Sequence, residues 1–452
     1  MNKSLRALNR YGLGARLGEA ARIGDPQAWL RSQLKASPAS SLPGDLPSLQ
    51  EIGAAVGQLR AAGRSRDSGA RRKAVQNLRD IARREGTAVL QQRILSDAPF
   101  LERLVSFWSN HLCVSVAGKL PVVPLAGHYE RAVIRPHVLG RFEEMVLASA
   151  RHPAMLLYLD NARSIGPSSP ASRRASRRGR DLGLNENYAR ELLELHTVGV
   201  DGGYIQEDVQ QLAQILTGWT VSGTGPRSRG STLPAFVFHE VRHQPGTKKV
   251  LGIRYRPEGV QEGEKVIRSL CRHPSTADFL ARKLVRHFVS DAPPKGAVER
   301  IAATFRDTKG DLLKVSGALV DLEEAWDPEN HKFRSPQDWL VAALRAIGAA
   351  EVPPRLGEAL RQLRQPLWAP PSPKGYGDAA QDWSDPDSLM NRAELARSMS
   401  RRLTRGRLDP AGLLEVVAVQ DDDPLHSMLA DKSIPRDERL ALAIGGPAFQ
   451  WR

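Results

Sequence analysis

The chain has 452 residues, of which 41% are hydrophobic, so it can bury a sizeable core in about three average domains or in one large helical domain. Its formal net charge of +15 indicates affinity for anions, yet no helix-turn-helix, aromatic ribonucleoprotein motif or zinc-finger pattern accompanies the charge, which disfavours nucleic acid as a partner. Two cysteines, Cys113 and Cys271, exclude a disulfide framework and are expected to be buried thiols.

Two further classes of protein are disfavoured by the absence of long apolar runs. No apolar stretch approaches the ~18 residues of a membrane-spanning helix. The N-terminal stretch also lacks the apolar segment that secretory signals contain. The sequence therefore predicts a protein without a membrane span that stays in the cytoplasm.

Helical periodicity of the apolar residues predicts a mainly α-helical, multi-helical protein with one small β-hairpin excursion. The first segment, 1–48, holds short helices and a Ser/Pro-rich linker. The second, 49–163, is the first part of the helical core. It opens with a basic stretch from Leu49 to about Arg84, broken near Gly63, which is typical of a solvated helical face.

Two pairs of polar residues stand out in this first part of the core. Asn110 and His111 lie at the far end of a strongly apolar helix, where their side chains could project into a pocket. Arg135 and His137 lie on either side of Pro136, which should end or kink a helix and turn both side chains outward. Structural burial is the commoner fate of a single histidine, so a functional role requires partners from other segments.

Residues 164–182 form an Arg/Ser-rich segment with the composition of a mobile loop. Its arginines are Arg173, Arg174, Arg177, Arg178 and Arg180. Because the segment directly precedes the most distinctive helix of the chain, it could close over a polar pocket and attract an anionic substrate. A disordered insert without a role is the simpler interpretation.

The segment 183–219 predicts a pair of helices. On a helix from Asn185 to Thr197 the polar residues share an arc of roughly 140°, and apolar residues fill the opposite arc. The polar arc consists of Glu186, Asn187, Arg190, Glu191 and Glu194. Three of these, spaced at i, i+4 and i+8, also fit a salt-bridged solvent face. His196 lies in the apolar arc and is interpreted as a core histidine, and a second helix is expected between Ile205 and Gly218.

The pattern changes in the segment 220–258, where AFVFHEVRHQPGTKKVLGIRY predicts two short strands about a Pro-Gly turn. His239 and His243 lie four residues apart there, but on a strand and turn this spacing does not define a zinc site. Lys248 and Lys249 fit an exposed hairpin.

Helices resume in 259–360, the second part of the core. The last segment, 361–452, contains a long irregular stretch followed by C-terminal helices. Long loops in compact domains are usually functional or disordered. The aromatic residues Trp368, Tyr376 and Trp383 favour a functional loop that packs over something.

Several blocks of the chain resemble, in order, the motifs of one bacterial family. They are LNRYGLG at 8–14, FWSNHL at 107–112, YERAVIRPHVLGRF at 129–142, HPAMLLYLDN at 152–161, GLNENYARELLELHTVGVDGGY at 183–204, TGWT at 217–220, HQPGTKKVLG at 243–252, HPSTADFLARKL at 273–284 and the ending GGPAFQWR, which is similar to the family's usual SPEFQ. By these motifs the chain resembles the bacterial proteins catalogued as domain of unknown function 1800, over nearly its whole length. Members of that family often look exported, and this chain departs from them in its N-terminal stretch.

No metalloprotease HExxH, phosphate-binding loop, dinucleotide fingerprint or G-x-S-x-G motif occurs in the chain. The distinctive helix also lacks the Glu-x-x-His spacing of di-iron bundles, because Leu193 stands three residues before His196. A site therefore requires that separate segments converge in the fold.

If they converge, the sequence predicts a polar pocket with catalytic Glu191, His111 and His137. Substrate would be bound by Asn110, Arg135, Asn187 and Arg190. Such a pocket could perform general acid–base catalysis. It could instead hold a single divalent metal, for which His111, His137, Glu191 and Glu194 are the candidate ligands.

The same residues could equally form a structural network, since a buried charge needs a partner. Two functional hypotheses stay open. The first is an enzyme that acts on an unidentified anionic small molecule. The second is a non-catalytic assembly protein whose Arg-rich surface binds an acidic protein.

Overall fold

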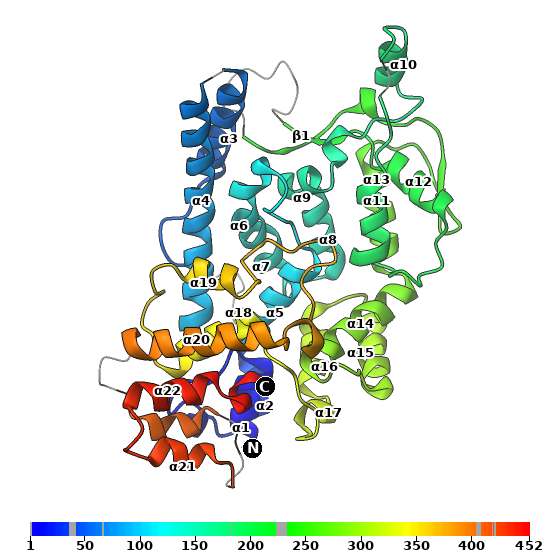
Figure 1. Ribbon diagram of the computed structural model, residues 1–452. Helices are drawn as coiled ribbons and strands as arrows, with labels where there is room; N and C mark the ends of the chain where they lie inside the picture. The colour runs from blue at the N-terminus through cyan, green and yellow to red at the C-terminus, as the bar shows by residue number, and fades with distance from the viewer. Residues whose placement is uncertain are drawn as a thin grey trace.

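The computed structural model describes residues 2–35, 42–65, 67–180, 182–222, 233–403, 408–417, 419 and 422–452. Within these ranges the chain is mainly α-helical with two small pairs of antiparallel strands, which confirms the predicted fold class (Figure 1). None of the helices in these ranges combines the length and apolar composition that a bilayer crossing requires.

Along with short 3-10 and π-helical turns, the described residues of the N-terminal third form nine α-helices. They are α1 (Lys3–Arg6), α2 (Pro26–Gln33), α3 (Leu49–Arg64), α4 (Ser68–Leu95), α5 (Pro99–His111), α6 (Ala126–Tyr129), α7 (Arg135–His137), α8 (Phe142–Arg151) and α9 (Pro153–Tyr158). The basic region divides near Gly63 as predicted, and α3 and α4 run side by side (Figure 1). Asp67 starts α4, because its carboxylate accepts hydrogen bonds from the amides of Gly69 and Ala70.

The middle of the chain contains α10 (Pro170–Ser176), α11 (Asn187–Glu191), α12 (Gln206–Ile215) and all four strands, β1 (Trp219–Val221), β2 (Phe236–Phe238), β3 (Lys248–Val250) and β4 (Ile253–Tyr255). The predicted loop 164–182 thus includes a short helix. Its arginines are exposed, which is expected for a segment on the surface. Part of the Gly/Ser-rich stretch after Val221 lies outside the described residues.

The strand pairing differs from the expected hairpin about Pro245 and Gly246. β2 pairs with β1 instead, and the tight hairpin joins β3 to β4 through Leu251 and Gly252. The exposed position expected for Lys248 is also wrong, because its side chain is buried in an ion pair with Glu262 at 3.0 Å. Periodicity identified the strands but carried no information on which strand each would face.

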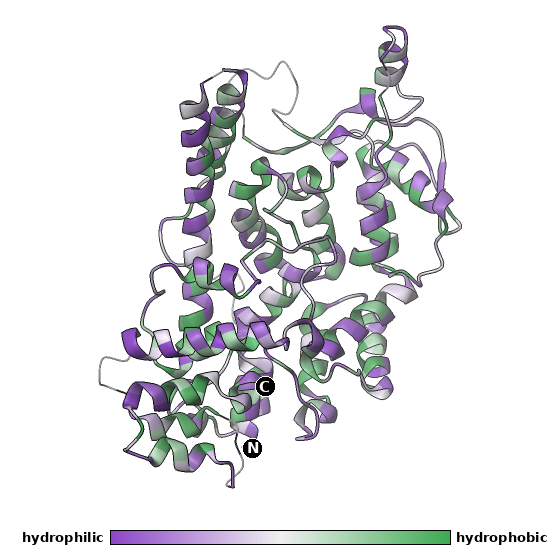
Figure 2. Ribbon diagram, in the orientation of Figure 1, coloured by the Kyte–Doolittle hydropathy of each residue, from purple (hydrophilic) through white to green (hydrophobic). Residues whose placement is uncertain are grey.

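The remaining helices are α13 (Val260–Cys271), α14 (Pro274–Phe288), α15 (Lys295–Asp307), α16 (Leu312–Val320), α17 (Glu323–Trp326), α18 (Pro336–Ala346), α19 (Leu356–Gln362), α20 (Pro386–Leu403), α21 (Leu425–Ala430) and α22 (Arg436–Gly445). The stretch between α19 and α20 is largely irregular, as predicted, and contains one 3-10 turn, Ala380–Asp382. The helices present apolar stripes to one another and polar stripes outward (Figure 2).

Two hydrophobic cores organise these helices. The larger contains Trp108, Phe142 and Phe288 and gathers helices from α2 to α17. The smaller contains Leu8 and Trp339 and joins the N-terminal segment to α18–α22. Segments from the two ends of the sequence therefore share one core, and the two termini lie close together (Figure 1).

Buried arginines connect these end segments to the middle of the chain. Arg452 donates hydrogen bonds to the backbone oxygens of Arg10 at 2.9 Å and His287 at 3.2 Å. Arg334 donates to the side-chain oxygen of Asn9 at 2.9 Å. Each buried guanidinium has several N–H groups that need hydrogen-bond acceptors. These arginines therefore hold the surrounding segments in fixed relative positions.

Candidate functional site

A cavity of about 470 Å³ lies where the C-terminal end of α5 meets α14 and the irregular stretch that follows α19. The side chains that give it chemical character are His111, Lys283, His287, Asn110, Cys113, Glu130, Arg93, Asp378 and Trp368. The aromatic stretch predicted to pack over something therefore packs over this cavity. The segments that line it are widely separated along the chain.

His111 and Lys283 meet at the wall of the cavity. His111 ends α5, is almost fully buried, and lies with its Nδ1 2.9 Å from the Nζ of Lys283. Its Nε2 lies 3.2 Å from the backbone oxygen of His196. Burial, reinforced by the positive charge of Lys283, lowers the pKa of His111 well below its usual value. His111 is therefore a neutral imidazole whose Nδ1 accepts a hydrogen bond from the lysine.

Lys283 projects from α14 and is half-buried. Its Nζ lies 5.5 Å from the centre of the Phe279 ring. Burial lowers the pKa of Lys283 to about 8. Cys113 and Asp378 act in the opposite direction, and the nearby Lys374 and Arg286 add to the lowering. An amine with a pKa in this range changes protonation near neutral pH, as acid–base groups in enzymes do.

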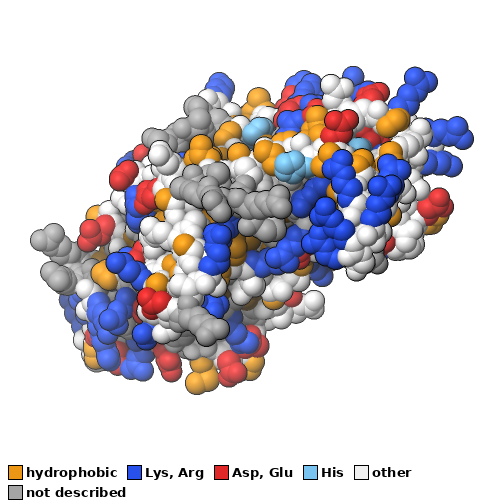
Figure 3. Space-filling model, turned by 90° about the horizontal axis from the view of Figure 1, so that it is seen from above, with side chains coloured by type: hydrophobic (Ala, Val, Ile, Leu, Met, Phe, Trp, Pro, Cys, Tyr) orange, Lys and Arg blue, Asp and Glu red, His pale blue; other side chains and the backbone are white. Residues whose placement is uncertain are grey.

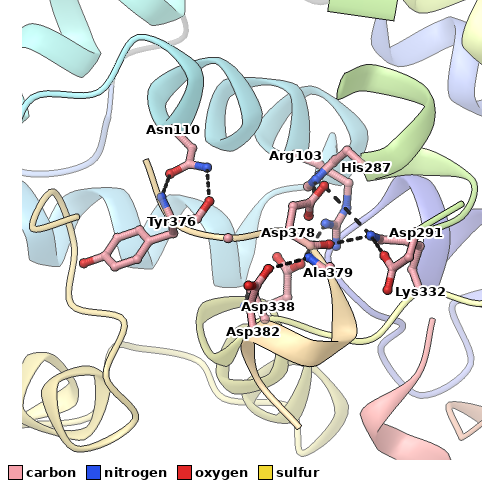
Figure 4. A network of polar contacts seen from close by, with 12 residues as sticks. Arg103, Asn110, His287, Asp291, Lys332, Asp338, Tyr376, Asp378, Ala379 and Asp382 are labelled. Carbon is pink, nitrogen blue, oxygen red and sulfur yellow. Dashed lines mark hydrogen bonds and ion pairs between the residues drawn. The ribbon is translucent and has the colours of Figure 1, made fainter. Parts of the chain in front are cut away.

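The irregular stretch is fastened over the cavity by hydrogen bonds to its backbone. Asn110 uses its whole amide for this purpose: its Oδ1 accepts from the amide of Tyr376 at 2.8 Å, and its Nδ2 donates to the carbonyl of Tyr376 at 3.0 Å (Figure 4). Gly375 lies directly against this contact at a φ of +85°, where a Cβ would come within 2.5 Å of the backbone oxygen of Asn110. A larger residue at 375 would displace the stretch.

Trp368 holds the same stretch at its other end in a strained conformation. Its φ of +50° lies in the left-handed region, which is unfavourable for a bulky side chain. Two contacts hold it there: its Nε1 donates to Glu130 at 2.9 Å, and its carbonyl accepts from the amide of Val116 at 2.8 Å. Such strain persists only where the surroundings enforce it, and it occurs most often at functional sites.

A network of charged groups lies along one side of the cavity (Figure 4). His287 Nδ1 lies 3.0 Å from Asp378 Oδ1, and Lys332 lies beside the same carboxylate. Burial alone would raise the pKa of Asp378, but His287 and Lys332 outweigh it and hold that pKa well below its usual value. Asp378 is therefore ionised and engaged by two partners.

Three cations at the cavity lack such partners. Among the residues that the structure describes, Lys283, Arg286 and Lys374 form no ion pair with a carboxylate. Arg286 and Lys374 are also exposed at the cavity wall. Asp378 acts on Lys283 at longer range, but no described carboxylate lies within ion-pair distance of these three cations.

Two of the predicted site residues have other partners. Arg135 is buried, not turned outward by Pro136, and its guanidinium binds both carboxylate oxygens of Glu102 at 2.8 and 2.7 Å. The expected outward orientation of Arg135 is wrong, because this ion pair holds it inside. His137 is half-buried, and its Nδ1 lies 2.7 Å from the backbone oxygen of Val133 in its own helical turn. Neither lines the cavity.

The polar arc of the distinctive helix lies mainly on the surface. Arg190 bridges Glu186 at 3.3 Å and Glu194 at 3.5 Å, so the predicted salt-bridged face is present. Asn187 is exposed. Glu191 is half-buried, and burial followed by repulsion from Glu194 raises its pKa. These residues do not line the cavity, and the catalytic and binding roles predicted for them stay predictions.

The apolar side of that helix contacts the site more directly. His196 is buried, as predicted for a core histidine, and its carbonyl faces the ring of His111. It ends a π-helical turn, Leu192–His196, that continues α11. Similar turns occur at Ala7–Tyr11 and Glu130–Ile134, so π-helical turns fall in three of the sequence blocks quoted above. Such turns are rare and are frequent at functional sites.

Sequence reasoning missed Lys283, His287, Asp378 and the positioning role of Trp368. Lys283 lies in the block HPSTADFLARKL, and that location was the only available signal. Across the described part of the chain, no three His, Cys, Asp or Glu side chains gather as ligands for a metal ion. His111, His137, Glu191 and Glu194 accordingly form no such group there.

In the described part of the chain these features define a helical protein with a polar cavity that an aromatic segment covers and that three cations without a carboxylate partner line. No curated protein and no solved structure matches the chain. A family model described as "Protein of unknown function (DUF1800)" matches residues 6–451. The chain belongs to this family.

Proposed function

We propose that the protein is an enzyme that binds a small anionic substrate in this cavity and uses His111 and Lys283 for proton transfer. The observation that carries the proposal is the set of three cations at the cavity, Lys283, Arg286 and Lys374, without a carboxylate partner among the described residues. Positive charge held in a partly desolvated cavity attracts anions strongly, because solvent screens it weakly.

The surroundings of the cavity add to this positive field. Asp338 is shared by Arg103, at 3.0 Å, and Arg452, at 3.7 Å. Glu130, Asp338 and Asp378 are thus each engaged by other cations, whereas Asp382 accepts a hydrogen bond from the amide of Ala379. An anionic ligand supplies the missing negative charge.

The contact between Lys283 and His111 supports acid–base chemistry. With a pKa of about 8, the Lys283 ammonium can release a proton near neutral pH. The lone pair of His111 Nδ1 lies in position to take that proton and return it. A proton can thus pass between two groups at the cavity wall without reaching bulk water.

Titration calorimetry with inorganic phosphate and with oxalate, at constant ionic strength, tests the proposal. We expect saturable binding that weakens at least tenfold in Lys283→Met and in Arg286→Gln, since each removes one unpaired cation. Arg282→Gln is the matched control, because Arg282 is an exposed arginine of the same helix that does not line the cavity. Absence of saturable binding, or equal weakening by Arg282→Gln, would refute the proposal.

A second candidate function, binding of an acidic protein, is favoured by the arginines on and after α10. Arg173, Arg174, Arg177, Arg178 and Arg180 are all exposed and form no ion pair with the described residues. The helix projects from the body of the molecule, and Lys and Arg side chains gather on the face seen from above (Figures 1 and 3). Binding of poly-glutamate that is lost when all five become glutamine would support this function. Unchanged binding would exclude it.

A further inference from the structure

Lys283 has the surroundings of a nucleophilic amine. It lines the cavity, contacts the ring of Phe279, and has no carboxylate within ion-pair distance among the described residues. A lysine paired with a carboxylate stays protonated and inert. A lysine that is desolvated and lies near other cations loses its proton more readily, and neutral lysines of this kind attack carbonyl carbons in many enzymes.

Hydrogen bonds also hold the Lys283 amine in place. The 2.9 Å contact with His111 Nδ1 holds Nζ at the cavity wall, and His111 is itself held by the carbonyl of His196. With a pKa of about 8, roughly a tenth of the Lys283 side chains are neutral at pH 7. An ordinary lysine, with a pKa near 10.4, is neutral in fewer than about one molecule in a thousand.

We infer that Lys283 condenses with the carbonyl group of a small aldehyde or ketone that carries a carboxylate, forming an imine with its Nζ. The inference rests on the proposed function, and it adds the chemical class of the substrate. Arg286 and Lys374 line the same cavity and supply the charge that would bind the carboxylate next to the reacting carbon.

The step balances without an oxidant or a reductant. The neutral Nζ attacks the carbonyl carbon and forms a carbon–nitrogen bond, while the carbonyl π bond breaks and its electrons move to oxygen. A proton passes from nitrogen through His111 Nδ1 to that oxygen. The oxygen then takes up a second proton from solvent, equivalent to the one that the Lys283 ammonium released on becoming neutral, and leaves as water. The nitrogen lone pair forms the second bond of the protonated imine.

Reductive trapping tests the inference on the full chain. The protein is incubated at pH 7 with pyruvate and sodium cyanoborohydride, and modified lysines are identified by peptide mass spectrometry. We expect Lys283 to be modified at least tenfold faster than Lys295 and Lys314. These two lysines are exposed and serve as internal controls. His111→Gln should slow trapping at Lys283 without changing trapping at the controls.

Methyl pyruvate, which presents the same ketone without the negative charge, separates the two parts of the inference. Arg286→Gln should slow trapping by pyruvate and leave trapping by methyl pyruvate unchanged, while Arg282→Gln should change neither. Equal selectivity for Lys283 over Lys314 with both probes in the wild type would keep the nucleophile and overturn the carboxylate-bearing substrate class.

If Lys283 reacts no faster than Lys314, the inference is wrong, even where phosphate still binds in the calorimetric experiment. If phosphate fails to bind while Lys283 is trapped selectively, the anion site of the proposed function fails and the nucleophile stands. The two failures are therefore distinguishable.

Discussion

The Nδ1 of His111 lies 2.9 Å from the Nζ of Lys283, although 172 positions separate the two residues in the sequence. A carbonyl oxygen only accepts hydrogen bonds, so the 3.2 Å contact of His111 Nε2 with the His196 carbonyl places the imidazole proton on Nε2. The Nδ1 lone pair therefore faces the lysine. The contact joins α5, α14 and the segment after α11 at one point.

Replacing Lys283 with methionine should stabilise the protein at neutral pH. The folded pKa, about 8, lies below the value near 10.4 of an unfolded lysine, so the unfolded state binds more protons between these pH values. The free energy of unfolding of the wild type therefore rises with pH across this window. Below about pH 8 the folded state bears the full free-energy cost of burying the protonated lysine. We expect Lys283→Met to gain on the order of 2 kcal/mol at pH 7, less the lost contact to His111.

Urea unfolding at pH 7 and pH 10 measures this effect. The gain should fall to roughly a quarter of its pH 7 value at pH 10, where the lysine is largely neutral in the folded state but still mostly protonated in the unfolded state. Lys314→Met, on the exposed side of α16, is the control and should change stability little at either pH. A gain that is equal at both pH values would point to packing instead of charge.

Two glycine-to-alanine substitutions should differ in their cost. Gly375 and Gly246 both have positive φ, +85° and +89°, so alanine strains each backbone by roughly 1–2 kcal/mol. Only at Gly375 would the new Cβ also meet an atom, the Asn110 backbone oxygen at 2.5 Å, whereas nothing lies within 4 Å of that position at Gly246. We expect Gly375→Ala to cost about 1–2 kcal/mol more.

Denaturant unfolding of both variants, with hydrogen exchange of residues 371–379, provides the measurement. Exchange there should accelerate in Gly375→Ala alone, because the backbone contact with Asn110 is displaced. Identical costs and unchanged exchange would mean that the stretch is not fastened through this contact.

Glu102→Gln should destabilise the protein far more than Glu186→Gln. Glu102 and Arg135 are both buried and share two hydrogen bonds, so removing the negative charge leaves a buried guanidinium without its main partner. Breaking such a pair costs about 3–5 kcal/mol, whereas a partly exposed helix pair such as Glu186 with Arg190 contributes only about 0.3–0.5 kcal/mol. Thermal unfolding of both variants gives the comparison, and similar losses would contradict this assignment of Arg135.

Acid should destabilise the protein through a buried pair of histidines. His128 Nδ1 lies 3.0 Å from His152 Nε2, and His152 Nδ1 accepts from the amide of Ala154. Burial lowers the pKa of His128 to about 4 and that of His152 well below its usual value. Below about pH 6.5 the unfolded state therefore binds more protons than the folded state. The pair has no effect on the free energy of unfolding above that pH and lowers it progressively toward pH 4.

Unfolding free energies between pH 7 and pH 4 test this account. His128→Gln should reduce the loss over that range by on the order of 2 kcal/mol, because one titrating group disappears. Substitution of the exposed His331 by glutamine serves as the control. A loss as steep in His128→Gln as in the wild type would assign the acid sensitivity to other groups.

Glu191→Gln tests the catalytic role predicted from the sequence. The pKa of Glu191 is raised by burial and then by Glu194, so its ionised form is disfavoured in the folded state, and glutamine should not lower the melting temperature. Because Glu191 does not line the cavity, we expect the variant to fold normally and to take up phosphate and pyruvate as the wild type does. Loss of uptake at an unchanged melting temperature would restore the catalytic role. A lowered melting temperature with intact uptake would make the carboxylate structural.

Much of the local structure was determined by the sequence itself. The break between α3 and α4, the end of α5 at His111, the ion pairs of Arg190 and the burial of His196 and both cysteines all follow from helical spacing, caps and hydropathy. These features depend on residues a few positions apart. These interactions are local, so a single sequence is enough to predict them.

Only the tertiary structure decided what each buried face would meet. It turned Arg135 inward to Glu102, paired β2 with β1, buried Lys248 against Glu262, and brought Lys283 to His111. Periodicity states that a face is buried, but the partner depends on how distant helices pack and on which desolvated charge most needs a counterion. The chemistry of the cavity depends on contacts between segments that are distant in the sequence. Spacing along the chain therefore could not identify Lys283.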